Sequence, residues 1–378
     1  MADPRIDPRA DLRVLRVLDL INTSESAKEL LLDRALCLAE RFGVEPHIAC
    51  SDGPYVEFIR SHGVTLHVLE TPRTMRPLAL AKGYGELLRL LRRHEFDIVH
   101  SHGSVLGLLA RLAGPFTDAR VVHTVHGFHF HERMRGARRS AYEWVERALL
   151  RLTDLTLSQN EEDFSILRSW NPRARCELIG NGIQLPKRDS GYMARRKLEY
   201  TLSCVARFEE VKNHRMLIDA MRRVRDAGVE VRLICFGKGE TQPAMVAHAR
   251  ELGLEDQIDF RGYVDHVLEY LEDVDLNVLT SIKEGVPRAL IESMAMGVPS
   301  VCTDVKGSRE VVVDGVTGRL VPVGDVEGFA GAVVGLLEDP DARQTMSEAC
   351  IRRAREQYDE NSICDRLHDL YTDLCPAG

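Results

Sequence analysis

Histidines gather in one stretch of this 378-residue chain, since residues 123–131 carry four of them and His100 and His102 lie a short way upstream. Histidine is the commonest metal ligand in proteins and the usual acid–base group near neutral pH. The cluster therefore fits either a metal site or a proton-transfer site. The spacing of the histidines by itself leaves both open.

The run 281–299 has the residue types of an anion-binding site. Pro287 predicts the start of a helix and Gly297 its end, because proline favours the first helical position and glycine commonly follows the last. The backbone N–H groups of residues 286–289 would then lack helical partners and attract an anion. Gly285 would let a ligand approach the main chain closely.

Two carboxylates flank this predicted helix start. Glu284 precedes it, and Glu292 would lie roughly 7.5 Å along the helix axis. Ionised carboxylates only accept hydrogen bonds, so each suits a sugar that offers hydroxyl groups. The same spacing also allows a structural interpretation, in which the helix dipole favours Glu284 and a salt bridge holds Glu292.

Two cations, Arg207 and Lys212, flank a predicted strand-to-helix loop. Arginine as a fork and lysine as a point charge could clamp a diphosphate, although Lys212 could instead pair with a neighbouring glutamate at the surface. The nearby Gly237-Lys238-Gly239 lacks the remainder of a G-x-G-x-x-G motif, which argues against a dinucleotide-binding fingerprint.

Bulk composition excludes several classes of protein. The net charge of −8 argues against a nucleic-acid partner. We find no run of about 18 apolar residues that would predict a membrane-spanning helix, and the amino-terminal residues have no apolar core of a signal peptide. The nine cysteines are scattered without a C-x-x-C pair. We therefore expect a cytoplasmic protein.

Short apolar runs alternate with longer amphipathic ones, which predicts an α/β fold of parallel sheets with helices on both faces. The length suits two domains of roughly 150–200 residues each. We predict a disordered tail (1–11), a first domain (12–185), a linker (186–198), a second domain (199–357) and a carboxy-terminal helical segment (358–378) that packs back on the first domain. The predicted strands are 13–21, 46–50, 65–69, 97–100, 120–125, 155–158, 177–179, 200–205, 230–236, 258–260, 276–279, 300–303 and 318–321, and the clearest helices are 27–42, 78–94, 138–152 and 359–374.

The unusual residues share one position in this pattern, because each follows the carboxyl end of a predicted strand. They are His126, Arg207, Gly237, Gly262 and Glu284. Doubly wound sheets bind ligands beyond the carboxyl ends of their strands. Two such domains facing each other would form a cleft for two substrates.

Four motifs in chain order resemble those of glycosyltransferase family 4: Arg207-x4-Lys212, Gly237-x-Gly239, Gly262-x-Val264 and Glu284-x7-Glu292. Segments 51–53, 96–102, 124–128 and 180–183 are similar to that family too. The resemblance covers residues 12–375 and looks most like the capsule and exopolysaccharide branch. It implies the GT-B fold, two tandem doubly wound Rossmann-like domains facing a cleft. The implied reaction is the retaining transfer of a hexose or N-acetylhexosamine from a nucleotide sugar, with UDP favoured, to an acceptor hydroxyl.

The resemblance also implies roles for the matching residues. Arg207 and Lys212 would hold the donor diphosphate and stabilise the leaving group without a metal or other cofactor. Glu284 would hold sugar hydroxyls, and His126 would lie close to the donor sugar. The leaving phosphate would take the acceptor proton. The implied donor-binding residues are Gly237, Gly262, Tyr263, Val264, Gly285, Val286, Pro287, Arg288 and Glu292, the last for the ribose.

The acceptor side is marked less clearly. His102 ends a predicted strand and His129 alternates with phenylalanines in a loop, so both are candidates to line it. Thr23 and Ser24 stand where many relatives carry a Gly-Gly loop, and their hydroxyls could replace its contacts or cap the next helix. The acceptor could be a sugar, a lipid-linked glycan or a small molecule. His100 and His123 are predicted to be packed structural histidines.

Residues 132–151 contain six arginines together with Tyr142 and Trp144. A basic amphipathic helix of this kind could dock on an anionic membrane at the cytoplasmic face, or it could be a solvated helix face.

Three other functions stay open. One is a nucleotide-sugar epimerase or hydrolase of the same fold, and another is a non-catalytic nucleotide-sugar sensor. The third is a metal-dependent hydrolase built on His100, His102 and His126, whose carboxylates would be Asp97 and Glu132.

Overall fold

The computed structural model describes residues 14–70, 76–128, 136–186, 194 and 197–376. It divides into two units: unit 1 contains the residues up to Ile179 and from Asn361 on, and unit 2 spans Gly180–Glu360. The chain thus changes unit before the predicted linker at 186–198, and it returns to unit 1 at its carboxyl end. The predicted tail at 1–11 lies outside the described residues.

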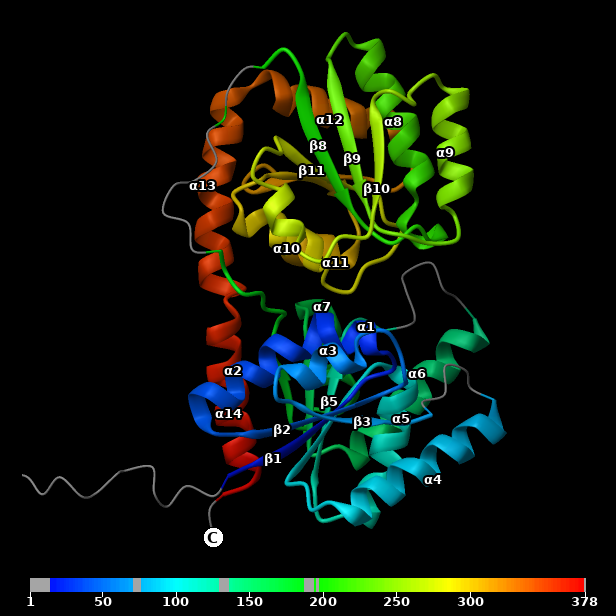
Figure 1. Cartoon of the computed structure of the whole chain (residues 1–378), viewed down its shortest axis with the longest axis vertical. Helices are drawn as coiled ribbons and strands as arrows, with labels where there is room; N and C mark the ends of the chain where they lie inside the picture. The colour runs from blue at the N-terminus through cyan, green and yellow to red at the C-terminus, as the bar shows by residue number, and fades with distance from the viewer. Residues whose placement is uncertain (1–13, 71–75, 129–135, 187–193, 195–196, 377–378) are drawn as a thin grey trace, which may run out of the picture. The chain divides into compact units, whose positions relative to one another are not determined.

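Unit 1 is built on a seven-stranded parallel sheet in the order β3-β2-β1-β4-β5-β6-β7 (Figure 1). Each strand coincides with a predicted one, because short apolar runs between turn residues form buried parallel strands. The strands are β1 (Arg16–Leu20), β2 (Glu45–Cys50), β3 (Thr65–Val68), β4 (Ile98–His102), β5 (Arg120–Val125), β6 (Leu155–Ser158) and β7 (Cys176–Leu178).

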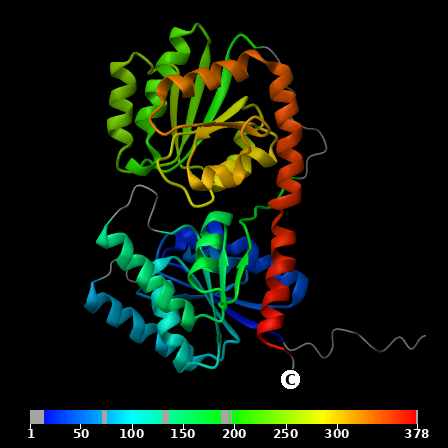
Figure 2. The ribbon, with the colours of Figure 1, turned by 180° about the vertical axis from the view of Figure 1, so that it is seen from behind.

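The helices of unit 1 cover both faces of this sheet (Figures 1 and 2). The first begins at Ser24, earlier than the predicted start at residue 27, because Thr23 caps it by accepting a hydrogen bond from the N–H of Ser26. The helices are α1 (Ser24–Ala27), the π-helix η1 (Lys28–Leu32), α2 (Asp33–Phe42), α3 (Val56–Ser61), α4 (Pro77–Arg93), α5 (Ser104–Ala113), α6 (Ala137–Leu149), α7 (Glu161–Trp170) and α14 (Glu360–Leu374), with short 3-10 turns η2 (Gly114–Phe116) and η3 (Leu150–Leu152).

Side chains along β1 alternate between the two faces of the sheet. Leu18 and Leu20 pack with α4 and α5 in one apolar cluster, whereas Val17 packs on the other face with residues of α2 and α14. Side chains two residues apart share a face of a strand. Asp19 therefore lies on the α2 and α14 face, inside an otherwise apolar strand.

Unit 2 contains a six-stranded parallel sheet in the order β10-β9-β8-β11-β12-β13. Its strands are β8 (Tyr200–Val205), β9 (Val231–Phe236), β10 (Ile258–Gly262), β11 (Leu276–Leu279), β12 (Ser300–Thr303) and β13 (Gly318–Val321). Its helices are α8 (His214–Asp226), α9 (Gln242–Glu251), α10 (Arg288–Ala295), α11 (Lys306–Val311), α12 (Val326–Glu338) and α13 (Pro340–Gln357), with 3-10 turns η4 (Glu210–Lys212) and η5 (Val267–Tyr270).

The two sheets share one topological feature. In unit 1 the strand order reverses between β1 and β4, and in unit 2 it reverses between β8 and β11. Ligands of doubly wound sheets bind at this switch point, outside the carboxyl ends of the strands. The predicted two-domain, doubly wound α/β fold is confirmed, and each unit has one switch point at which a site would be expected.

Candidate active site

The switch point of unit 2 holds a lysine and a glutamate in direct contact. Lys212 Nζ lies 2.6 Å from Glu284 Oε1, and Ser281 Oγ donates a hydrogen bond to the same oxygen at 2.5 Å. Lys212 ends the 3-10 turn after β8, and Glu284 follows β11. Lys212 therefore does not pair with a neighbouring surface glutamate. It pairs with a carboxylate that its own motif predicts to be functional.

Backbone contacts hold the two loops that carry this pair. The N–H of Ile282 donates to the carbonyl of Val211 at 2.8 Å, and Thr280 Oγ1 donates to the carbonyl of Asn213 at 3.0 Å. Asn213 itself has a left-handed backbone (φ 51°), which lets the chain turn sharply from Lys212 into α8. The lysine and the glutamate are thus fixed by the loops rather than by their mutual attraction alone.

Helix α10 begins beside Glu284. It starts at Arg288, one residue after the predicted start, with Pro287 as the residue before the first turn. Pro287 itself makes no side-chain capping hydrogen bond to this end. The loop before it is fixed by packing, because a Cβ on Gly307 would lie 2.0 Å from the carbonyl oxygen of Gly285.

Three of the charges predicted to contact the donor have partners within their own segments. Arg288 Nε donates to Glu292 Oε1 at 2.9 Å, an i,i+4 pair on α10. Arg207 lies 2.7 Å from Glu209 and is 73% exposed. The structural interpretation, a salt-bridged helix glutamate, thus describes the contact that Glu292 makes here.

The glycines predicted to meet the donor have packing reasons of their own. Gly237 (φ 135°) donates its N–H to the carbonyl of Gly262 (φ 84°) at 2.8 Å. A Cβ on Gly237 would lie 2.1 Å from the carbonyl oxygen of Ala206. The following positions leave side chains accessible, since Tyr263 is 42% exposed and Val264 is half-buried, whereas Val286 is buried.

The switch point of unit 1 holds a chain of four hydrogen-bonded side chains, here called the histidine chain: Asp19, His102, His126 and Gln159. Asp19 Oδ1 lies 3.0 Å from His102 Nε2, and His102 Nδ1 lies 2.9 Å from His126 Nε2. His126 Nδ1 lies 3.0 Å from Gln159 Oε1. The structure therefore joins His126 and His102, which the sequence assigned to the donor and acceptor sides.

Both ring nitrogens of His126 are occupied within this chain. Burial is the main cause that lowers the pKa of His126 to about 3. His102 and Arg34 act in the same direction, and the bond to Gln159 acts against them. His126 is therefore neutral at physiological pH. A substrate that binds a ring nitrogen of His126 must displace one of its two partners.

His100 and His123 have structural environments, as predicted. His100 is hydrogen-bonded to Tyr371 OH at 2.6 Å and to Thr124 Oγ1 at 2.7 Å. His123 lies on the opposite face and contacts Ser101 Oγ at 3.0 Å. The pKa of each histidine is lowered well below its ordinary value. Burial is the largest cause, and neighbouring charges add to it.

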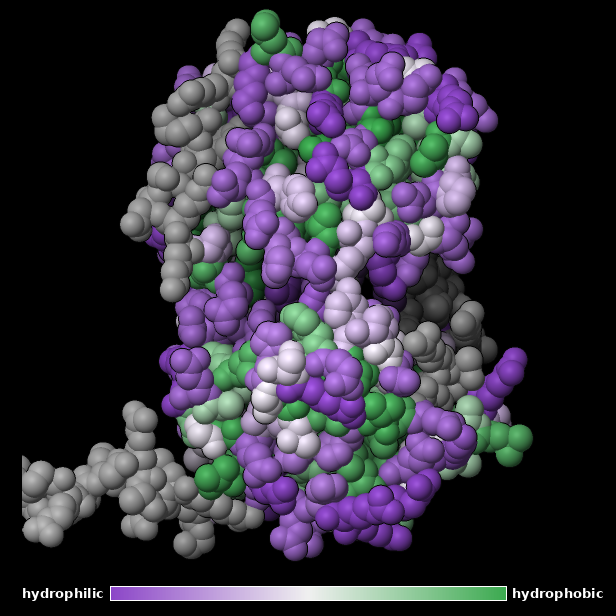
Figure 3. Space-filling view, in the orientation of Figure 1, coloured by the Kyte–Doolittle hydropathy of each residue, from purple (hydrophilic) through white to green (hydrophobic). Residues whose placement is uncertain are grey.

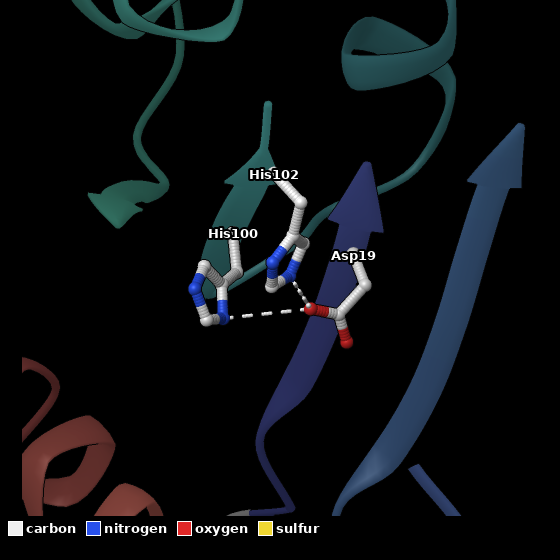
Figure 4. Close-up of side chains that lie close together, drawn as sticks. All are labelled: Asp19, His100 and His102. Carbon is white, nitrogen blue, oxygen red and sulfur yellow. Dashed lines mark hydrogen bonds and ion pairs between the residues drawn. The ribbon is translucent and has the colours of Figure 1, made fainter. Parts of the chain in front are cut away.

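Asp19, His100 and His102 also bring three potential metal-ligand atoms within 4.8 Å of one another (Figure 4). The carboxylate of this group is Asp19. The expected Asp97 instead accepts a hydrogen bond from the N–H of Arg16 at 2.8 Å, and Glu132 lies outside the described residues. Every ring nitrogen of the two histidines is, however, hydrogen-bonded to a protein group. An ion bound here would have to break one such bond on each histidine, so hydrogen bonding by itself accounts for the cluster.

The loop after β1 is used for structure. Thr23 Oγ1 accepts from the N–H of Ser26 at 3.1 Å, which is helix capping. Ser24 is fully buried, and a Cβ on Gly53 would lie 2.2 Å from its Oγ. Of the other predicted acceptor-side residues, His102 lies in the histidine chain and His129 lies outside the described residues.

Helix α6 shows how the arginines of residues 132–151 are used where they are described. Arg139 pairs with Glu143 at 2.7 Å, and the Arg147 guanidinium lies 5.4 Å from the centre of the Trp170 ring. Trp144 is 71% exposed. No described helix is long and apolar enough to cross a membrane, and Figure 3 shows hydrophobic residues in small groups among hydrophilic ones on the visible face.

Unit 1 also contains an open cavity of about 1000 Å³ between β3 and α4. Lys82, Arg89 and Arg93 line it together with Asp52 and Glu70 and with apolar residues. It lies along the edge strand β3. Strand β2 separates β3 from β1, where the histidine chain begins, so the cavity is distinct from that chain.

Three contributors to these sites were missed from the sequence. Asp19 had a detectable signal, because a lone acid inside the apolar strand 16–20 must find a buried partner. Gln159 follows β6 as His126 follows β5, but an isolated glutamine carries no pattern. Ser281 lies in the run 281–299 and could be assigned only once its distance to Glu284 was known.

Two family models match the chain, one for each unit. The model described as "Glycosyl transferase 4-like domain" matches residues 32–182, and the model described as "Glycosyl transferases group 1" matches residues 199–339. Among curated relatives, the putative glycosyltransferase EpsD of Bacillus subtilis is 26% identical over 87% of this chain and 94% of its own length. The UDP-Gal:alpha-D-GlcNAc-diphosphoundecaprenol alpha-1,3-galactosyltransferase of Escherichia coli is 24% identical over 89% of this chain and 90% of its own.

Solved structures with the same fold include sucrose-phosphate synthase from Thermosynechococcus elongatus, with a TM-score of 0.81 at 20% identity, covering 96% of this chain and all of that one. Anabaena HepE in complex with UDP and glucose has a TM-score of 0.78 at 19% identity and covers 95% of this chain and all of its own. At these identities the likeness concerns the fold alone.

Proposed function

The chain belongs to the group 1, family 4 type of glycosyltransferases with the GT-B fold, and we propose that it transfers a hexose or N-acetylhexosamine from UDP to an acceptor hydroxyl with retention of configuration. The observation that carries this proposal is the 2.6 Å contact between Lys212 and Glu284 at the switch point of unit 2. A cation for a diphosphate and a carboxylate for sugar hydroxyls lie side by side there. The start of α10, preceded by Pro287, adjoins them.

We assign the donor contacts as follows. Lys212 binds the diphosphate, and the exposed Arg207 leaves Glu209 to join it. Glu284 accepts hydrogen bonds from the sugar, and the first N–H groups of α10 donate to an anionic or sugar oxygen. Glu292 accepts from the ribose after releasing Arg288. Main chain at residues 262–264 contacts the base, with Tyr263 exposed beside it.

The leaving group is stabilised by the protein's own cations in this proposal. As the bond between sugar and diphosphate breaks, negative charge grows on the phosphate that Lys212 and Arg207 contact. That phosphate then takes the proton of the attacking hydroxyl on the same face, which retains the anomeric configuration. The reaction needs no metal ion and no protein base, and His126 contributes by a hydrogen bond to the donor sugar.

The acceptor is proposed to be a lipid-linked glycan or another sugar at the cytoplasmic face of a membrane. The Escherichia coli relative and a Campylobacter jejuni relative are both named for diphosphoundecaprenol-linked acceptors. Exposed Trp144 on α6 supplies an amphipathic side chain that suits the membrane interface.

Thermal unfolding with UDP, GDP or ADP, each with and without EDTA, tests the donor assignment. A ligand at 100 times its dissociation constant adds about 2.7 kcal/mol of stability. We expect UDP to stabilise the protein most and EDTA to change nothing. Equal stabilisation by all three, or loss of the effect in EDTA, would contradict the proposal.

The reaction itself is tested by supplying UDP sugars with and without candidate acceptors. Release of UDP that depends on an acceptor supports transfer. Rapid consumption of the donor without any acceptor would instead identify an epimerase or hydrolase of the same fold.

A further inference from the structure

The histidine chain crosses the sheet of unit 1 in strand order. Asp19 lies in β1, His102 ends β4, and His126 and Gln159 follow β5 and β6. These four strands are consecutive neighbours in the sheet. Parallel pairing therefore places each side chain beside the next, and the chain is a product of the topology rather than of any local motif.

Counting protons along the chain fixes where each one lies. A carboxylate only accepts, so the proton between Asp19 and His102 is assigned to His102 Nε2. With one proton on each ring, His102 Nδ1 is bare, and the proton between the two rings belongs to His126 Nε2. His126 Nδ1 is then an acceptor. Gln159, whose Oε1 is placed 3.0 Å from it, satisfies it when the oxygen and nitrogen of the amide are exchanged so that the NH2 group donates.

The reverse arrangement needs one more proton. If Gln159 accepted from His126 Nδ1, then His126 Nε2 would accept from His102 Nδ1, and His102 would be a cation. Arg34 is a buried residue, 7% exposed, and its charge acts on both His100 and His126. A further buried cation at His102, which contacts His126, is disfavoured by desolvation and by repulsion.

We propose that Asp19 and His102 are positioning residues that hold His126 as the Nε2–H tautomer, so that its Nδ1 accepts a hydrogen bond from a substrate hydroxyl when Gln159 withdraws. This inference rests on the proposed function for the identity of the hydroxyl, which belongs to a sugar. Gln159 occupies the ligand position in the unbound protein. The role of His126 is that of an acceptor, with no proton transferred.

The tautomer can be measured directly by ¹⁵N NMR of the full-length protein labelled at histidine, with His126→Gln identifying the resonances of His126. The wild-type protein should show a protonated Nε2 and a bare Nδ1 at pH 7. Asp19→Asn replaces an obligatory acceptor by an amide that can also donate, so the share of Nδ1–H tautomer should rise to half or more. Ser101→Ala is the matched control, because its hydroxyl contacts His123 on the opposite face and should leave His126 unchanged.

A second variant covers the case in which Asp19→Asn does not fold. His102→Asn keeps a polar group near the Nδ1 position but removes the link to Asp19, and it should also abolish the preference for one tautomer. A protonated Nδ1 in the wild type, or an unchanged tautomer in the variants, would overturn the proposal. Reversible shifts of both His100 and His102 on adding Zn²⁺, removed by EDTA, would identify a metal site instead.

Nucleotide-sugar binding separates this inference from the function on which it rests. The UDP sugar that most raises the unfolding temperature should shift His126 Nδ1 more than Nε2. Stabilisation without that shift would refute the hydroxyl contact alone. If no UDP sugar stabilised the protein, the proposed function would fail while the tautomer result still decided the positioning role.

Discussion

The two units place different chemistry at the same point of the same kind of sheet. At the switch point between β1 and β4, unit 1 has a chain of hydrogen-bonded side chains that includes neutral His126. Between β8 and β11, unit 2 has an ion pair whose lysine and glutamate side chains are 18% and 8% exposed. The topology determines where a site can form, and the residue types at the strand ends determine what it does.

Acid should distinguish the units most strongly. The described histidines whose pKa is lowered all lie in unit 1: His47, His67, His100, His123 and His126. Their folded pKa values lie below the ordinary 6.5, so the unfolded state binds more protons and stability is lost as the pH falls from 6.5 toward about 4 for His67 and about 3 for His126. Each of these histidines lowers the free energy of unfolding by up to about 1.4 kcal/mol per pH unit over this range.

Hydrogen exchange at pH 7 and pH 5 measures this difference. Peptides of unit 1 should lose protection at pH 5 while those of unit 2 keep theirs. His67→Gln should weaken the acid effect, and His62→Gln, at the exposed position that follows α3, should leave it unchanged. Simultaneous opening of both units, or earlier opening of unit 2, would show that the buried histidines do not control acid stability.

The ion pair of unit 2 gives the next largest effect. Lys212→Ala and Glu284→Ala should each lower turnover by about 10²-fold or more, because both contact groups whose charge changes in the transition state. Lys212→Ala should also remove most of the stabilisation by UDP. Arg222→Ala on α8 is the control, since the side chain of Arg222 is 42% exposed and contacts Asp226 one turn away and the carbonyl of Leu252. Near wild-type turnover in both variants would eliminate this site.

His126→Ala sharpens the comparison because it separates binding from turnover. We expect turnover to fall by about 10²-fold, with stabilisation by UDP unchanged, since the nucleotide is assigned to unit 2. Activity should be measured as UDP release at saturating donor, beside UDP-dependent unfolding of the same variant. A parallel loss of UDP binding would mean that the histidine chain contributes to nucleotide affinity, contrary to the division of roles proposed above.

The two sites also differ in how far the sequence predicted them. Glu284 and Lys212 belong to motifs. The sequence placed Glu284 just before α10 and Lys212 in the loop after β8, and the resemblance implied that both serve the donor, but it did not predict their contact. His126 was singled out by type, but its partners Asp19 and Gln159 are distant in sequence and meet only because β1, β4, β5 and β6 are neighbours. The positions of the strands could be predicted from apolar runs. The order of the strands, which brings the histidine chain together, cannot be predicted from any local sequence pattern.

Local capping and packing explain the smaller differences between the predicted and the observed structure. The first helix begins at Ser24 because Thr23 caps it, although apolar periodicity becomes visible only later. Gly237 stays a predicted donor contact, and its backbone also needs glycine because a Cβ there would lie 2.1 Å from the carbonyl oxygen of Ala206. A residue type near a binding site can thus be required by packing, and interatomic distances are needed to tell a packing requirement from a role in ligand binding.

Membrane contact would be the weakest distinguishing property, and it would belong to unit 1. The α6 charges are partly neutralised, because Arg139 pairs with Glu143 and Glu146 pairs with Arg111 from α5. Each arginine near an anionic surface contributes only about 1 kcal/mol of attraction. We therefore expect weak, salt-sensitive binding to vesicles containing phosphatidylglycerol, seen as a small blue shift of Trp fluorescence. Trp144→Phe should abolish the shift, because the other tryptophan, Trp170, packs against Phe128 and Arg147. An equal shift with neutral vesicles, or in the variant, would exclude docking through α6.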